Sequence, residues 1–318
     1  MAQVIALGEL LIDFVPTVSG VSLDEAPAFQ KAAGGAPANV AVGLARLGAS
    51  CAFLGKVGDD PFGHFLADTL RANGVETAGL RFDGEARTAL AFVTLRADGE
   101  REFMFYRHPS ADMRYRPDEV DASLIEGARI FHCGSVSLIS EPARAATLHA
   151  LDLARAAGLL VSYDPNLRLM LWPSAEAAHA AILEAWPLAN VIKVSDEELR
   201  FLSGEDNLLR AGRALWTPEL RLLLITRGAG GCTWLTANCA GGLPGLAVAA
   251  VDATGAGDSF MAAALAGLLE RPALWEDVPA LEQALRVANA AGALATTKRG
   301  AIPALPTREE IAALLGEG

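Results

Sequence analysis

Residues 251–269, VDATGAGDSFMAAALAGLL, place three small residues directly before Asp258 and an apolar, alanine-rich run directly after it. Small residues such as Gly255 and Gly257 allow a tight turn and a close approach of the backbone to a ligand. The apolar run predicts a buried helix that starts near Asp258, and the first N–H groups of a helix have no partners within it. The turn and the helix dipole together predict a binding site for an anion.

The sequence allows two roles for Asp258 at this position. Aspartate is a good N-terminal cap for a helix, and a carboxylate beside a bound phosphoryl group can instead take a proton from a substrate hydroxyl. The stretch alone favours neither. Phe260 stands where a dinucleotide fingerprint has its third glycine, which argues against an NAD-dependent dehydrogenase, and the sequence has no GxxxxGK[ST] loop.

Composition limits the classes of protein that the chain can belong to. The 318 residues are 52% hydrophobic and carry a formal net charge of −12, which argues against nonspecific binding to nucleic acid or to an anionic membrane. The four cysteines form no CxxC pair, so we expect reduced thiols. The first residues contain no basic segment typical of a signal peptide, and no apolar run is long enough to cross a bilayer. We therefore expect a cytoplasmic protein.

Short apolar runs that end in polar or glycine residues predict strands buried on both faces. They occupy residues 3–9, 51–58, 129–135, 159–166, 190–198 and 221–228. Alanine-rich helical stretches lie between several of them, and this alternation predicts a parallel sheet with helices on both faces. Ligands of such sheets bind beyond the carboxyl ends of the strands, where the polar residues fall.

Two segments depart from this alternation. Residues 88–107 contain two β-rich runs around a turn near Asp98-Gly99, which is typical of a hairpin. Residues 13–20 and 27–35 look like further strand and loop. We expect one domain over residues 1–318, with a small β-sheet from about 13–33 and 86–112 that serves as a lid or as a homodimer surface.

A second glycine pair, Gly34-Gly35, precedes Pro37 and Asn39 at the start of a predicted helix. The glycines allow close approach to a small ligand, and Asn39 offers both a donor and an acceptor, which suits a sugar hydroxyl. Asp13, which is expected to end the first strand segment, is a natural partner for two hydroxyls. The alternatives are a plain helix start with an early proline and a solvated turn carboxylate.

Taken in order, the two glycine stretches resemble the two signatures of the ribokinase-like (PfkB) carbohydrate kinases, over nearly the whole chain. Within that family, GELLIDFVPTVSG (8–20), SYDPNLRLMLWPS (162–174) and KRGAIPALPT (298–307) are most similar to fructokinases. The resemblance implies a ribokinase-like α/β three-layer sandwich with a central, mostly parallel sheet and a small β-sheet lid. It also implies transfer of the γ-phosphoryl group of ATP, with Mg²⁺, to the 6-hydroxyl of D-fructose.

The resemblance also implies roles for individual residues. Asp258 is the base, and the N–H groups of Ala256, Gly257 and Asp258, in the turn with Gly255, form the anion hole. The sugar would be held by Asp13, Gly34, Gly35, Asn39, Tyr106 from the lid and Arg168. The nucleotide site would be lined by Lys193, Thr226, Gly228, Gly231 and Asn289.

Metal sites follow from the same resemblance, with some departures. Glu198 would hold Mg²⁺ through water, although Ser195 replaces the usual asparagine three residues earlier. A monovalent cation, potassium, would lie near Asp252, Thr254 and Gly300. Ala253 replaces a common threonine, and Arg227, where a smaller or acidic residue is common, is expected to face solvent.

Other acceptors remain open for the same chemistry: 2-keto-3-deoxygluconate, ribose or an aminoimidazole riboside. A keto acid would need a cation for its carboxylate, which Arg107 or Arg168 could supply. A kinase-like binding protein without catalysis is disfavoured because Gly255, Gly257 and Asp258 are all present.

Overall fold

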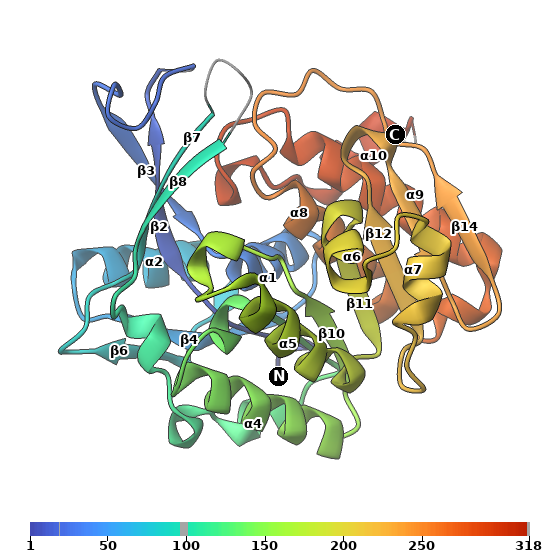
Figure 1. Cartoon of the computed structure of the whole chain (residues 1–318), viewed down its shortest axis with the longest axis horizontal. Helices are drawn as coiled ribbons and strands as arrows, with labels where there is room; N and C mark the ends of the chain where they lie inside the picture. Colours follow the sequence, from blue (N-terminus) through green and yellow to red (C-terminus); the bar gives the residue numbers. More distant parts are fainter. Residues whose placement is uncertain (19, 96–100, 317–318) are drawn as a thin grey trace.

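The computed structural model describes residues 1–18, 20–95 and 101–316, and it is built around a large twisted sheet (Figure 1). The strands of this sheet are β1 (Val4–Leu7), β4 (Cys51–Gly58), β5 (Val75–Glu76), β6 (Leu80–Asp83), β9 (Ile130–Gly134), β10 (Leu160–Asp164), β11 (Val191–Ser195), β12 (Leu222–Thr226), β13 (Cys232–Leu235) and β14 (Ala240–Leu243). Their order is β14-β13-β12-β11-β10-β9-β1-β4-β5, with β6 beside β4. The pairs β12–β13 and β13–β14 are antiparallel, and the other pairs are parallel.

Helices cover both faces of the large sheet, because successive side chains of a strand point to opposite faces. In β1, Val4 and Ala6 join one hydrophobic core, while Ile5 and Leu7 join the other. The first core is closed by α1 (Ala36–Arg46), α2 (Pro61–Ala72), α8 (Ala256–Glu270), α9 (Val278–Ala295) and α10 (Arg308–Leu315). The second is closed by α3 (Ala122–Glu126), α4 (Ala143–Ala156), α5 (Ala175–Ala185), α6 (Asp196–Ser203) and α7 (Leu208–Ala214). The three-layer α/β sandwich is thereby confirmed.

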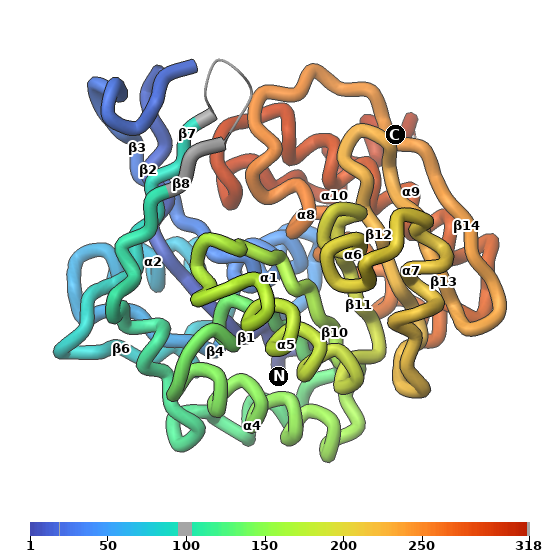
Figure 2. Tube along the Cα trace, in the orientation of Figure 1, coloured from blue at the N-terminus to red at the C-terminus, as the bar shows by residue number. Residues whose placement is uncertain are grey.

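A second, four-stranded sheet stands out from the main body (Figure 2). It consists of β2 (Leu11–Pro16), β3 (Phe29–Gly34), β7 (Leu90–Leu95) and β8 (Arg101–Tyr106), in the order β3-β2-β7-β8. The antiparallel pairing of β7 with β8 confirms the predicted hairpin, whereas the turn expected near Asp98-Gly99 lies outside the described residues. The small lid sheet is therefore present, while the division of the chain into a single domain stays a prediction.

The position of Asp13 corrects one expectation. The first strand ends at Leu7, and Asp13 lies inside β2, paired with Ala32 of β3 and Ala91 of β7. The apolar residues from Leu10 to Ile12 continue the hydrophobic pattern of β1 in the sequence, so the change from one sheet to the other leaves no break in hydrophobicity. No helix in the described part of the chain combines the length and apolarity needed to span a membrane.

Candidate active site

The start of α8 has the geometry of an anion site. Gly255 is the N-cap residue, in the left-handed region at φ +79°, and it provides no side-chain cap. The N–H of Ala256 donates to the carbonyl of Ala253 at 3.3 Å. The N–H groups of Gly257 and Asp258 find no acceptor among the described residues. Two free donors, rather than the three that were expected, therefore face outward at the positive end of the helix.

Gly34 and Gly35 are required by close packing at the start of α1. A Cβ on Gly34 would lie 2.0 Å from Oδ2 of Asp13, and a Cβ on Gly35 would lie 2.3 Å from the carbonyl oxygen of Glu9. Gly35 is also the N-cap of α1 at φ +111°, where side chains are strained. Gly34 therefore makes room for the Asp13 carboxylate, and Gly35 makes room for the backbone of Glu9.

Asn39 and Asp258 link the two glycine stretches. Nδ2 of Asn39 donates to Oδ2 of Asp258 at 2.7 Å, and both side chains are buried. Burial and the nearby Asp164 raise the pKa of Asp258 to about 6, against the lowering effect of the Asn39 hydrogen bond. A carboxylate with a pKa near neutrality suits a general base.

Asp258 opens into a cavity of about 150 Å³, which we call the acidic cavity. It is lined by residues that include Glu9, Asp13, Gly35, Asn39, Phe105, Arg107, Val136, Arg168, Lys193, Thr254, Gly255, Gly257 and Asp258. Burial raises the pKa of Asp13 to about 7, although Arg168 opposes the shift. Three carboxyl groups thus converge on a small polar space, which fits an uncharged ligand rich in hydroxyl groups.

Lys193 brings a positive charge to the same cavity. Its Nζ lies 2.8 Å from Oδ2 of the buried Asp164, and a Cβ on Gly257 would lie only 2.9 Å from that Nζ. Burial alone would lower the pKa of Lys193, but Asp164 and Glu198 hold it above its usual value. A permanent ammonium group therefore lies directly beside the anion site.

A second cavity of about 510 Å³, the apolar cavity, meets the acidic cavity at Ala253 and Gly257. Its lining includes Thr226, Gly228, Ala229, Gly231, Val248, Ala256, Phe260 and Asn289. An added Cβ on Gly228, at φ +52°, would contact nothing, so the backbone lies open to the cavity there. A flat apolar group with an anionic tail that reaches the start of α8 fits this shape.

The structure corrects two expectations about side-chain positions, one at Tyr106 and one at Arg227. Tyr106 does not line the acidic cavity, since its ring packs edge-to-face on Phe92, with 5.7 Å between centroids. Its neighbour Phe105 lines the cavity instead. Arg227 does not simply face solvent, because its half-buried guanidinium donates to the carbonyls of Cys232 and Leu243, both at 3.4 Å.

The expected metal ligands are engaged with backbone groups. The carboxylate of Glu198 accepts the N–H of Leu167 at 2.6 Å and that of Ser195 at 2.7 Å, as a cap of α6. Asp252 accepts the N–H groups of Thr254 and Gly300, which ties these two loops together. Across the described residues, no group of three His, Cys, Asp or Glu side chains could hold a metal ion. Mg²⁺ fits only as a companion of a phosphate ligand that supplies oxygens of its own.

Three residues of the site escaped the sequence analysis in whole or in part. Glu9 and Asp164 are buried carboxyl groups at the site; Asp164 ends β10, and Glu9 lies two residues after the end of β1. Their position at carboxyl ends of parallel strands is the signal that could have found them. Arg107 was considered only as a partner for a keto acid, yet its Nη2 lies 2.6 Å from Oδ2 of Asp112.

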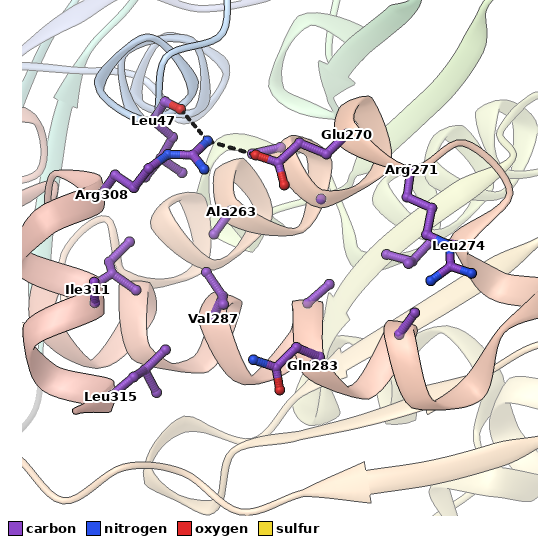
Figure 3. A pocket seen from close by; sticks show the side chains of 15 residues that line it. Leu47, Ala263, Glu270, Arg271, Leu274, Gln283, Val287, Arg308, Ile311 and Leu315 are labelled. Atoms are coloured by element: carbon purple, nitrogen blue, oxygen red, sulfur yellow. Dashed lines mark hydrogen bonds and ion pairs between the residues drawn. The ribbon is translucent and has the colours of Figure 1, made fainter. Parts of the chain in front are cut away.

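A third cavity, of about 350 Å³, lies among α8, α9 and α10 (Figure 3). Arg308 bridges the carbonyl of Leu47 and the carboxylate of Glu270 there, and Arg271 is paired with Asp277. Both arginines of this mostly apolar cavity are thus already paired with carboxylates, so the cavity has no feature of a reaction site.

Comparisons with known proteins agree with this geometry. Residues 1–308 match the family model described as pfkB family carbohydrate kinase. The chain is 58% identical to "Probable fructokinase-4" of Arabidopsis thaliana, over 98% of this chain and 96% of that protein. The chain is also similar to the crystal structure of fructokinase with bound ATP from Xylella fastidiosa, with a TM-score of 0.91 and 37% sequence identity. The match covers 100% of this chain and 99% of the Xylella chain. A fructokinase double mutant from Vibrio cholerae O395, in a fructose-, ADP- and potassium-bound form, has 35% sequence identity to this chain and a TM-score of 0.86. The match covers 99% of this chain and 98% of the Vibrio chain.

Proposed function

The chain belongs to the pfkB family of carbohydrate kinases, and we propose that it is a fructokinase, which transfers the γ-phosphoryl group of ATP to the 6-hydroxyl of D-fructose. One observation carries this proposal. Asp258, bonded to Asn39, lies where the acidic and apolar cavities meet, with two free N–H groups of α8 beside it. Phosphoryl transfer needs this combination of a positioned base and donors for the phosphate oxygens.

In the proposed reaction, the sugar occupies the acidic cavity and the nucleotide occupies the apolar cavity. Asn39 fixes the Asp258 carboxylate, which takes the proton of the sugar hydroxyl as the phosphoryl group moves in line. The N–H groups of Gly257 and Asp258 and the ammonium group of Lys193 stabilise the charge on the phosphoryl oxygens. Mg²⁺ carried by ATP offsets the remaining negative charge. Gly228, Gly231, Thr226 and Asn289 are proposed to contact the nucleotide.

Of the two arginines that could hold the carboxylate of a keto acid, the buried Arg107 is already paired with Asp112. Arg168 lines the acidic cavity and donates to the backbone carbonyls of Asn166 and Leu167, so the preference for fructose rests on the similarity to fructokinases. Asp13, Gly34, Gly35, Asn39 and Arg168 remain the proposed sugar contacts. Tyr106 would reach the sugar only if the lid sheet moved.

The proposal is tested by incubating the purified protein with ATP, Mg²⁺ and a panel of sugars and following ADP release. Fructose should be the best acceptor, and the product should be a substrate for phosphoglucose isomerase, which distinguishes fructose 6-phosphate from the 1-phosphate. A higher kcat/KM with ribose or 2-keto-3-deoxygluconate, or formation of the 1-phosphate, would contradict the proposal.

We also propose that potassium binds near Asp252, Thr254 and Gly300, behind the start of α8. The potassium-bound fructokinase structure from V. cholerae supports this proposal by similarity, and Asp252 already joins the two loops. The rate in potassium chloride should exceed the rate in choline chloride at equal ionic strength. Equal rates would exclude activation by potassium.

A further inference from the structure

Glu9 is a buried acidic residue to which neither the sequence pattern nor the proposed reaction assigns a role. It lies in the connection between β1 and β2, is 5% exposed, and belongs to the lining of the acidic cavity. Its Oε1 accepts the N–H of Ala36 at 2.9 Å, in the first turn of α1. Since Gly35 has no side chain to cap this helix, Glu9 supplies the cap from outside.

The second carboxyl oxygen of Glu9, Oε2, does not take part in capping α1. Oε2 is buried and has no hydrogen-bond partner among the residues that the structure describes. Buried polar groups are nearly always paired, and an unpaired one destabilises the folded protein. The nearby Arg107 donates to Asp112 and to the carbonyl of Val136. Since Glu9 belongs to the lining of the acidic cavity, a ligand in that cavity can supply a partner for Oε2.

A second unpaired oxygen lies in the lining of the same cavity. Nδ2 of Asn39 donates to Asp258, while Oδ1 of Asn39 is buried and has no partner in the described part of the chain. Two unpaired oxygens around one small cavity indicate a ligand with more than one hydroxyl group. Burial raises the pKa of Glu9 to about 7, so Oε2 can accept or donate a hydrogen bond, and a hydroxyl group matches either state.

We propose that Glu9 determines sugar specificity, because its Oε2 binds a hydroxyl group of the acceptor while its Oε1 holds the start of α1. This inference rests on the proposed function, since it assumes that a sugar occupies the acidic cavity. It assigns to the cavity a hydroxyl contact separate from the reacting hydroxyl at Asp258. Sugars that lack the contacted hydroxyl should bind weakly for this reason.

The test compares the wild type with Glu9→Gln and Glu9→Met, first on the best acceptor of the sugar panel. The glutamine side chain keeps an oxygen that can accept the N–H of Ala36, but it carries an amide NH₂ group in place of Oε2. The methionine side chain has neither of these polar groups. Calorimetric titration without ATP and steady-state kinetics are then repeated with analogues that each lack one hydroxyl group other than the reacting one: 1-deoxyfructose, 2,5-anhydromannitol, 3-deoxyfructose and 4-deoxyfructose. In both variants we expect Kd and KM for fructose to rise about tenfold, with the kcat of Glu9→Gln within about threefold of the wild type.

The deoxy analogues separate contact from positioning. The analogue that lacks the contacted hydroxyl should bind the wild type about tenfold more weakly than fructose, and neither variant should weaken it much further. If both variants weaken the binding of fructose and of every analogue by the same factor, Glu9 acts only through its hydrogen bond with Ala36, and the inference is wrong. An unchanged Kd in both variants would also overturn it.

Two further comparisons make the outcome specific. The hydroxyl oxygen of Ser174 caps α5 by accepting the N–H of Ala177 at 3.1 Å, outside both cavities. The control variant Ser174→Ala loses this cap and should leave the Kd for the sugar unchanged. If the wild type binds and phosphorylates another sugar instead of fructose, the proposed function fails, and the same series on that sugar and its deoxy analogues still decides the role of Glu9. If the wild type binds no sugar, both proposals fail.

Discussion

Asp258 is the residue on which the proposed chemistry depends most directly. The change Asp258→Asn keeps an oxygen that can accept from Asn39 but removes the base. We expect kcat to fall by roughly 10²–10⁴-fold, with KM for fructose nearly unchanged, in an ADP-release assay. The exposed Asp152, on α4, provides the matched control Asp152→Asn, which should keep the wild-type rate. A normal kcat in Asp258→Asn would remove Asp258 from the mechanism.

Asn39 should set the pH at which Asp258 begins to work. Burial raises the pKa of Asp258 to about 6, and the hydrogen bond from Asn39 opposes that rise. A base must be deprotonated, so kcat/KM should decrease as the pH falls below about 6. In Asn39→Ala the opposing hydrogen bond is lost, and this acidic limb should move to higher pH.

The position of the limb, rather than the height of the profile, is the readout, because Asn39→Ala can also weaken sugar binding. Asn207→Ala, which removes the cap of α7, should leave the limb where it is. A limb of Asn39→Ala that coincides with that of the wild type would mean that Asn39 does not tune Asp258.

Sequence reasoning at this scale placed Asp258 with its glycines and Asn39 with Gly35 at one site. The structure brings Asn39 and Asp258 into hydrogen-bond contact, and their roles in the reaction stay predictions. Sequence reasoning failed where the face of a strand decides. Tyr106 and Phe105 are neighbours in β8 and point to opposite faces, and the sequence of the lid does not say which face meets the cavity.

At the scale of elements, the contact between α1 and α8 holds the site together. Gly43 of α1 faces Ala262 of α8, and a Cβ on Gly43 would lie 2.7 Å from the Cβ of Ala262. The same two helices carry Asn39 and Asp258. The missing Cβ therefore sets the distance between the helices that present the base and its partner.

Gly43→Ala should push α8 away from α1. Overpacking of this kind costs about 1–3 kcal/mol, and better helix propensity returns at most about 1 kcal/mol. We expect a lower melting temperature and a lower kcat. The double variant with Ala262→Gly should restore both, whereas Gly84→Ala, whose Cβ would contact nothing, should change neither. Failure of the second change to restore kcat would show that the helix spacing does not control the site.

The elements themselves were largely predictable, because buried parallel strands read as apolar runs with polar ends. The first strand shows the limit of that signal. Leu10 to Ile12 continue the apolar pattern of β1 but belong to the lid sheet. Hydrophobicity reports burial and does not report which sheet a strand joins. The capping role of Glu198 was readable, because Ser195 and Glu198 form a capping box at the start of α6. Its second hydrogen bond, from the N–H of Leu167, was hidden because that residue is far away in the sequence.

At the scale of the whole molecule, the site should destabilise the fold at neutral pH. Burial raises the pKa of Asp13 and of Glu9 to about 7 and that of Asp258 to about 6. In the unfolded chain these groups lose their protons near pH 4. The folded state therefore binds more protons than the unfolded state between about pH 4 and pH 7. Because stability falls with pH wherever the folded state binds more protons, these groups lower the free energy of unfolding as the pH rises through that window.

Asp13→Asn removes one of these carboxyl groups without changing its size. In the free protein the variant should match the wild type near pH 4 and exceed it at pH 8, by roughly 4 kcal/mol in the free energy of unfolding, because each of the about three units of pKa difference corresponds to about 1.4 kcal/mol. Thermal unfolding across this pH range measures the difference. The control is Asp68→Asn, at an exposed position on α2. Its difference from the wild type in the free energy of unfolding should stay nearly constant with pH. This control accounts for the general charge repulsion in a chain with a net charge of −12. A difference for Asp13→Asn that does not grow with pH would mean that the cavity leaves this carboxylate as easy to ionise as it is in the unfolded chain.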